Sequence, residues 1–174
     1  MLHELSDGTR VAIRPVEPGD KPRLEAAIAR LSSESIRRRF LAAKPSLSSA
    51  ELRYLTEIDG FNHIALVAVL QHDRERIVGV ARCVRLEPGA ETAEFAIVVG
   101  DALQGKGLGT TLASALADAA CAVGIRRFAA TVLADNSAVQ HMMEGFGGGL
   151  HQRVQEGGVR ELVAELAVCA ELAA

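Results

Sequence analysis

The chain has 174 residues, which fits a single domain spanning residues 1–174 that can form a hydrophobic core without disulfides or metal. With 49% hydrophobic and 24% charged residues, its composition excludes disordered and fibrous proteins. The net charge of −3 and the 3% of aromatic residues argue against a nucleic-acid partner, which would need a basic surface or base-stacking rings.

The cysteines and the apolar segments indicate the compartment. Cys83, Cys121 and Cys169 are odd in number, lack a CxxC motif and lie in apolar surroundings, which predicts reduced thiols, neither a disulfide framework nor a zinc site, and a cytoplasmic protein. The amino-terminal residues contain no long apolar stretch, so we expect no secretory signal. No segment reaches about 18 uncharged apolar residues, so we expect no membrane partner.

The first third of the chain predicts one strand and three short helices. Residues 9–14 alternate polar and apolar side chains, as a half-buried strand does. Asp20 is expected to cap the first helix, and residues 32–40 form a second that carries three successive arginines, one of them packed. Ser48 and Glu51 form a capping box that opens the third helix.

Strands dominate the rest of the predicted order. Three of them, joined by short loops, form an antiparallel meander at residues 64–70, 77–86 and 92–99. A helix at 110–123 and a strand at 128–133 follow. The chain then continues with a helix at 136–143 and two strands, 150–154 and 159–168, around a turn at Glu156, Gly157 and Gly158. This order predicts a mixed α/β (or α+β) fold.

Residues 98–109 are a glycine-rich connection between an expected strand and an expected helix. Gly105, Gly107 and Gly109 remove side chains where backbone N–H groups would face outward. The first turn of a helix adds unpaired N–H groups and a partial positive charge, so the segment suits a phosphate or pyrophosphate. The alternative is a connection rich in glycine only because it turns tightly.

Three phosphate-binding motifs can be compared with this segment. A P-loop fails because Gly107 stands where a Ser or Thr hydroxyl must hold Mg²⁺. A dinucleotide fingerprint fails because its third glycine is misplaced. The pattern Q/R-x-x-G-x-G/A is matched in full by Gln104, Gly107 and Gly109.

With this motif the chain resembles the GNAT family of N-acetyltransferases over roughly residues 7–166. Within the family it looks most like bacterial protein-lysine acetyltransferase domains, through residues 11–15, 31–35 and 93–96. The resemblance implies a GNAT fold, in which a mixed, mostly antiparallel central sheet flanked by helices splays after the fourth predicted strand. Gly100 is the expected point of divergence, because it lacks a Cβ.

The resemblance also implies acetyl-CoA as co-substrate, and no metal. Its pantetheine arm would pair like an added strand with Ile97, Val98 and Val99. Asn136 would lie near the pantetheine or the thioester. The pyrophosphate would lie on backbone N–H groups of consecutive residues, namely Gln104, Gly105, Lys106, Gly107, Leu108, Gly109 and Thr110.

Glu94 is the candidate general base. Attack on a thioester needs a neutral amine, whereas a free lysine has a pKa of ~10.4, so a base is useful. Glu94 lies in an otherwise apolar strand, where partial desolvation would raise its pKa. The alternative is a solvent-facing residue on a half-exposed strand.

The position seven residues after Asn136, where many relatives carry a tyrosine acid, is Met143. Without that tyrosine the coenzyme would leave as a thiolate, since its thiol pKa should be near ~8.5. The resemblance implies acetyl transfer to a primary amine, with protein lysine as the favoured acceptor. A small-molecule amine and a non-catalytic acyl-CoA-binding sensor are the alternatives. The oligomeric state stays open, with a homodimer as one option.

Overall fold

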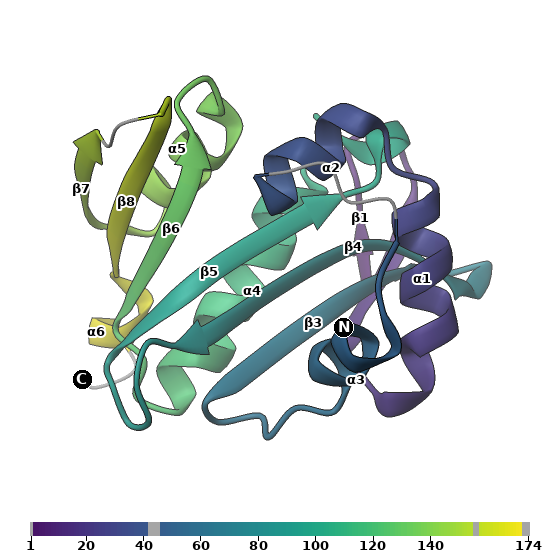
Figure 1. The fold of residues 1–174 in the computed structure, drawn as a ribbon, viewed down its shortest axis with the longest axis horizontal. Helices are drawn as coiled ribbons and strands as arrows, with labels where there is room; N and C mark the ends of the chain where they lie inside the picture. Colours follow the sequence, from purple (N-terminus) through teal and green to yellow (C-terminus); the bar gives the residue numbers. More distant parts are fainter. Residues whose placement is uncertain (1, 42–45, 155–156, 172–174) are drawn as a thin grey trace.

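The computed structural model describes residues 2–41, 46–154 and 157–171, in which eight strands form one sheet of order β1-β2-β3-β4-β5-β6-β8-β7 (Figure 1). All neighbouring strands are antiparallel except β5 and β6, which are parallel. The strands are β1 (Leu2–Glu4), β2 (Arg10–Pro15), β3 (His63–Leu70), β4 (Asp73–Arg85), β5 (Thr92–Val99), β6 (Arg127–Leu133), β7 (Gly147–Val154) and β8 (Val159–Leu166).

Helices cover both faces of this sheet (Figure 1). One face carries α1 (Lys21–Ala29), α2 (Ser33–Phe40) and α3 (Ser49–Thr56), with a core that includes Leu24, Leu52 and Val67. The other carries α4 (Leu108–Ala122) and α5 (Ser137–Glu144), with a core that includes Leu112, Phe95 and Phe128. The remaining helices are η1 (Pro18–Asp20), η2 (Asp101–Leu103) and α6 (Val168–Glu171).

The predicted strands and helices are all present, with shifted ends. Four short elements, β1, η1, η2 and α6, were not predicted, because so few residues cannot show a periodicity. The last strand ends at Leu166 because the chain then turns into α6. Of the turn expected at 156–158, Glu156 lies outside the described residues. The prediction of a mixed α/β sheet is confirmed.

The prediction that the cysteines carry no disulfide is wrong for one pair. Cys121 of α4 and Cys169 of α6 form a disulfide, with their Cα atoms 5.2 Å apart. The two residues are 48 positions apart in the sequence, and only the return of β8 along β6 brings α6 against α4. Cys83 is free and buried, and burial raises the pKa of its thiol to about 12.

The sheet splays between β5 and β6. Their register pairs Thr92 with Arg127 and ends where Glu94 pairs with Ala129. Beyond Glu94 the strands separate into a V (Figure 1). The splay after the fourth predicted strand is therefore confirmed, but it begins well before Gly100, because β6 diverges from β5 while β5 is still paired with β4.

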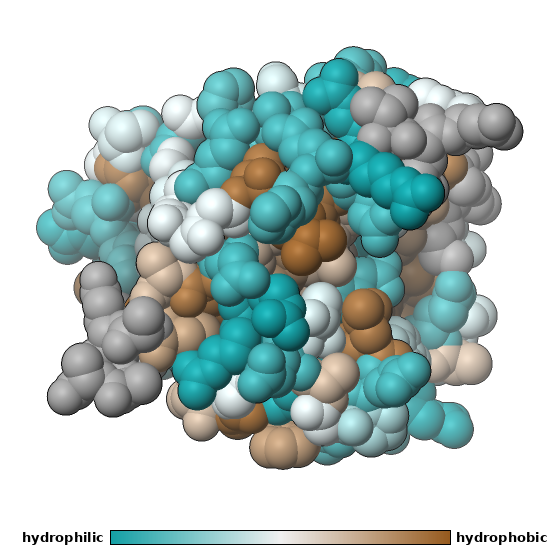
Figure 2. Space-filling view, turned by 90° about the vertical axis from the view of Figure 1, so that its left-hand side faces the viewer, coloured by the Kyte–Doolittle hydropathy of each residue, from teal (hydrophilic) through white to brown (hydrophobic). Residues whose placement is uncertain are grey.

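The outer side formed by β7 and β8 has a mixed surface. Hydrophilic residues separate the apolar ones into small patches in this view, as on a solvated face (Figure 2). Among the described residues, none of the helices combines the length and the apolar character that crossing a bilayer requires. Within the same residues, no group of His, Cys, Asp and Glu side chains is placed to hold a metal ion.

Candidate functional site

The separation of β5 from β6 opens a cleft of about 450 Å³. Strand β5 forms one wall, β6 and α5 form the other, and α2 with the glycine-rich loop lies at the mouth. Of the predicted site residues, eight line this cleft: Glu94, Ile97, Val98, Val99, Gln104, Gly105, Gly109 and Asn136. The sequence pattern therefore located the cleft from separate segments of the chain.

The edge of β5 that faces the cleft carries free peptide groups. Backbone bonds from Gly100 to Val78 and from Leu86 to Thr92 set the alternation along the β4–β5 pair. By this alternation the N–H and C=O groups of Ile97 and Val99 point away from β4, into the cleft, while those of Val98 point toward β4. The peptide groups of Ile97 and the N–H of Val99 can thus pair with an extended chain, whereas the Val99 carbonyl already accepts from Gln104 Nε2 at 3.1 Å. Val98 contributes to the wall.

The glycine-rich loop turns sharply into α4. Gly105 and Gly107 have φ angles of 71° and 89°, and a Cβ built on either would meet nothing within 4 Å. Gly107 is the N-cap of α4 and has no side chain to cap it, so no capping side chain occupies the first N–H groups of this 15-residue helix. This space and these donors fit a phosphate group.

The remaining loop residues contribute backbone rather than side chains. Lys106 forms an ion pair with Asp7, 2.8 Å between Nζ and Oδ2, and this contact lowers the pKa of Asp7 to about 2. The Leu108 side chain is fully buried in the core. Thr110 lies by the groove between α4 and α5. None of these three residues lines the cleft.

Helix α2 is tied to the loop across the mouth of the cleft. The carboxylate of Asp101 accepts bonds from the backbone N–H of Ser32 and from the hydroxyls of Ser32 and Ser35, at 2.7–2.8 Å. Burial raises the pKa of Asp101, but these hydrogen bonds outweigh it and hold the pKa below its ordinary value. Gln104 donates to the Ser35 hydroxyl and to the Val99 carbonyl. The sequence did not predict this network.

Glu94 is the last residue of β5 that is paired with β6. Its side chain is exposed, not partly desolvated as the sequence led us to expect. The pairing of β5 with β6 ends at this residue, so β6 does not cover the side chain. It pairs with Val84, which pairs with His63, so these three residues project from the face that carries α1, α2 and α3.

Asn136 is buried at the N-cap of α5, where its side-chain oxygen accepts from the N–H of Val139 at 3.4 Å. Met143 is fully buried in the core and does not line the cleft, whereas Met142 does. Phe146 packs edge-on against Phe95 and Phe128. This aromatic cluster packs the chain that leaves α5 against β5 and β6.

Three residues behind Glu94 were not predicted as site residues. Arg82 is 5% exposed and donates to His63 Nε2 at 3.0 Å and to the Leu55 carbonyl at 3.3 Å. Because arginine only donates, Nε2 must accept, so the proton of this neutral ring is on Nδ1. Burial, and then the charge of Arg82, lowers the pKa of His63 to about 4. Arg39, the packed member of the arginine run, completes this group.

Comparisons with known proteins agree with this geometry. A family described as "Acetyltransferase (GNAT) domain" matches residues 10–148. Acetyltransferase Pat of Mycolicibacterium smegmatis is 38% identical over 135 residues, which cover 78% of this chain and 40% of that protein. Acetyltransferase PA5475 of Pseudomonas aeruginosa is 34% identical over 143 residues, covering 81% and 76%.

Among solved structures, the GNAT domain of S. lividans PAT superposes with a TM-score of 0.85 at 31% identity, covering 95% of this chain and 96% of that one. The chain thus spans nearly all of an isolated GNAT domain but only about two fifths of the Mycolicibacterium Pat protein.

Proposed function

The chain belongs to the GNAT family of acetyltransferases, which use acetyl-CoA as co-substrate, and from this premise we propose that it transfers an acetyl group from acetyl-CoA to a primary amine by direct attack in a ternary complex. The observation that carries the proposal is the cleft between β5 and β6, with the phosphate-binding loop at its mouth and Glu94 at its apex. Each end supplies what one reactant needs.

Acetyl-CoA fits the cleft by its own chemistry. The pyrophosphate would lie on the N–H groups between Gln104 and Thr110, in the space that Gly105 and Gly107 leave open. The pantetheine amides would pair with the peptide groups of Ile97 and with the N–H of Val99, as an added strand does. This arrangement directs the thioester along β5 toward Glu94.

Glu94 would act as the general base, directly or through one water. The amine nitrogen attacks the thioester carbonyl carbon, the C–N bond forms and the C–S bond breaks. The proton lost by the amine goes to the carboxylate of Glu94 and then to solvent. Glu94 is exposed on the α1–α3 face, so an amine can reach it from this face while the coenzyme lies in the cleft between β5 and β6.

The leaving sulfur would depart as a thiolate and take its proton from solvent. Its pKa near ~8.5 makes this feasible at neutral pH without a tyrosine acid. Met143, which stands at the position of that tyrosine, is buried in the core and takes no part in this step. Tyr54 lies on the acceptor face, with its ring centroid 5.0 Å from that of His63.

A protein lysine is the first candidate acceptor, supported by the likeness to the acetyltransferases named Pat. A small-molecule amine is the second candidate. The absence of a tyrosine acid at Met143 favours a third reading, a domain that binds acyl-CoA and senses it without turnover. The two enzymes consume acetyl-CoA together with a protein or a small amine, whereas the sensor binds acyl-CoA and consumes nothing.

Release of free thiol from acetyl-CoA, measured across amines and proteins, tests the proposal, together with thermal melting in the presence of CoA. We expect CoA to raise the melting temperature and an amine to release thiol. CoA stabilisation with no thiol release from any acceptor would instead establish the sensor.

Gly107→Val isolates the loop in the same assays. We expect CoA binding to weaken by about 100-fold or more, because the side chain fills the phosphate space. Gly89→Val is the matched control, since Gly89 has a similar φ of 78° in an open turn outside the cleft. Equal CoA affinity in both variants would remove the loop from the site.

A further inference from the structure

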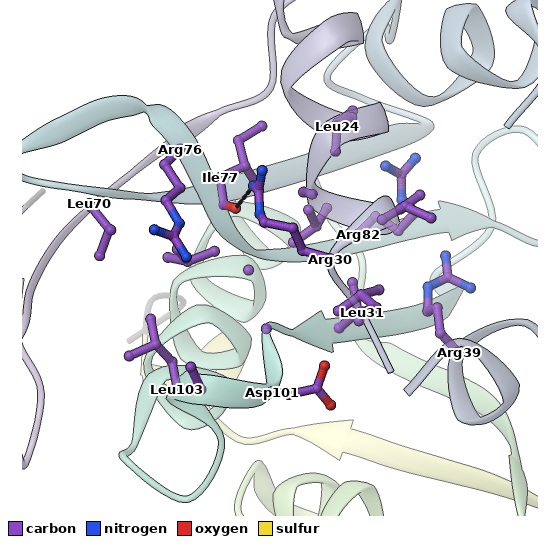
Figure 3. A pocket seen from close by; sticks show the side chains of 18 of the residues that line it. Leu24, Arg30, Leu31, Arg39, Leu70, Arg76, Ile77, Arg82, Asp101 and Leu103 are labelled. Atoms are coloured by element: carbon purple, nitrogen blue, oxygen red, sulfur yellow. Dashed lines mark hydrogen bonds between the residues drawn. The ribbon is translucent and has the colours of Figure 1, made fainter. Parts of the chain in front are cut away.

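A second cavity, of about 460 Å³, lies on the α1–α3 face between the end of α1, strands β4 and β5, and η2 (Figure 3). Its wall is largely apolar, with Leu24, Ile28, Leu31, Val80 and Val98 among the lining residues. It adjoins the cleft, because both cavities are lined by Arg39, Phe40, Ala96, Val98 and Asp101. A molecule whose amine lies at Glu94 therefore has this second cavity beside it.

The charges around this cavity are one-sided. Of the described residues that line it, four are arginines and one is an acid: Arg30, Arg39, Arg76, Arg82 and Asp101. The carboxylate of this acid is held by Ser32 and Ser35 and makes no ion pair with these four arginines. A chain of net charge −3 thus has a cationic pocket on this face.

Arg39 and Arg82 stand at one end of the pocket, and Arg30 and Arg76 lie toward the other (Figure 3). Arg82 is more than nine-tenths buried, and its bonds to His63 and Leu55 both go to uncharged acceptors. Arg39 lies over the ring of Phe40, 5.0 Å from its centroid. Within the described parts of the chain, neither arginine has an ion-pair partner.

Two guanidinium groups in such surroundings are costly without an anion. Burial, and then the charge of Arg39, lowers the pKa of Arg82 to about 10. Burial also lowers the pKa of Arg39, an effect that the charges of Glu94 and Tyr54 partly offset. Glu94 lines the cleft and not this pocket, and it makes no ion pair with either arginine, so neither guanidinium has a carboxylate bound to it. A carboxylate is an anion that arginine binds by two parallel N–H···O bonds.

We propose that the acceptor amine carries a carboxylate, which binds to Arg39 and Arg82 while its apolar part occupies the second cavity. This inference rests on the proposed acetyl transfer and names its substrate class. The carboxylate belongs to a free amino acid or to an acidic side chain beside a lysine in a peptide. In both cases the same two arginines bind the carboxylate.

Matched acceptors test this class through thiol release. One arm compares leucine with leucinamide. The other compares two blocked pentapeptides whose central lysine is flanked by glutamates or by glutamines. We expect the carboxylate-bearing member of at least one arm to have a kcat/KM about 10- to 100-fold higher, the usual effect of a charge-assisted hydrogen bond. The arm that shows the preference identifies the source of the carboxylate.

Arg39→Gln should reduce that preference to less than about twofold, because it removes one cation without emptying the core. Arg37→Gln is the matched control, since Arg37 is exposed, pairs with Glu34 and lines neither cavity. A variant that keeps its response to CoA in thermal melts is folded, so loss of preference in it reports on recognition.

A binding measurement separates this inference from the proposed reaction. The probes are 4-methylpentanoate and 4-methylpentanamide, which have no amine to acetylate, together with the two pentapeptides. Tighter binding of a carboxylate form to the parent than to Arg39→Gln supports the inference even if no acceptor releases thiol, an outcome that would refute acetyl transfer alone. Equal binding and equal kcat/KM of the charged and uncharged forms in both arms would overturn the inference and leave the transfer intact.

Discussion

Strand β4 carries two buried arginines on opposite faces of the sheet, and they are satisfied in different ways. Arg85, 7% exposed on the α4 face, donates to the carbonyls of Phe61, Ala90 and Val123 and lies 4.7 Å from the centroid of the Phe61 ring. Arg82, 5% exposed on the α1–α3 face, has one carbonyl, one histidine and a second arginine beside it.

This difference separates a structural charge from a functional one. Arg85 joins β4 to two loops and to the end of α4 by hydrogen bonds to backbone carbonyls, which are a permanent part of the fold. Arg82 faces a cavity and has N–H groups for which the described residues offer no acceptor. A buried cation whose three nitrogens all donate to backbone carbonyls holds the fold, whereas one with a nitrogen to spare at a cavity wall is placed for a ligand.

The largest expected effect is the stability difference between Arg85→Met and Arg82→Met. Arg85→Met leaves three backbone carbonyls without a donor, so we expect the free energy of unfolding to fall by about 3–5 kcal/mol. Arg82→Met leaves two acceptors, His63 Nε2 and the Leu55 carbonyl, without a donor, but it also relieves the repulsion with Arg39, so we expect the smaller loss of about 1 kcal/mol. Urea denaturation of both variants measures this. Equal losses would contradict the comparison.

The next largest effect is a pH dependence of the free energy of unfolding that comes from His63, the partner of Arg82. His63 has a pKa of about 4 in the folded protein against its ordinary 6.5. Between these values the unfolded chain binds more protons, so stability falls as the pH drops from 6.5 to 4, by up to about 3 kcal/mol. Above pH 6.5 the effect vanishes.

The check is urea denaturation at pH 7.5, 5 and 4 of the parent and of His63→Gln, which should flatten this window. Asp20 titrates at lower pH: burial raises its pKa, but bonds from Arg14 and Glu17 hold it at about 2, below its ordinary 3.8. Its contribution to the free energy of unfolding is lost as the pH falls from 3.8 to about 2, which is below the pH window of His63. An identical slope in both proteins between pH 6.5 and 4 would rule out His63 as the source.

Glu94→Gln has the smallest expected free-energy effect, on the rate alone. We expect kcat to fall about 100-fold, or about 2.7 kcal/mol, with the melting temperature and CoA affinity unchanged, because the base is lost and the cleft is not. Glu25→Gln, an exposed site on α1, controls for the charge change. A parental rate and pH profile in Glu94→Gln would remove Glu94 from the reaction.

Much of the cleft could be predicted from local signals. Gln104, Gly107 and Gly109 form a motif within a few residues, and Glu94 is an acid in an apolar strand. The exposure of Glu94 was not predictable, because it depends on where β6 leaves β5. The Cys121–Cys169 disulfide and the Asp101–Ser35 contact join segments 48 and 66 residues apart, beyond the reach of any local pattern.

By itself the amino-acid sequence determined the order of the main elements, the glycine-rich loop and the family, because these depend on periodicity and backbone chemistry within short windows. Only the tertiary structure decided that Arg39, His63 and Arg82 meet behind Glu94. Their meeting depends on the register of β3, β4 and β5 and on the docking of α2 against β5. Each of these is set by packing between residues that are distant in the chain.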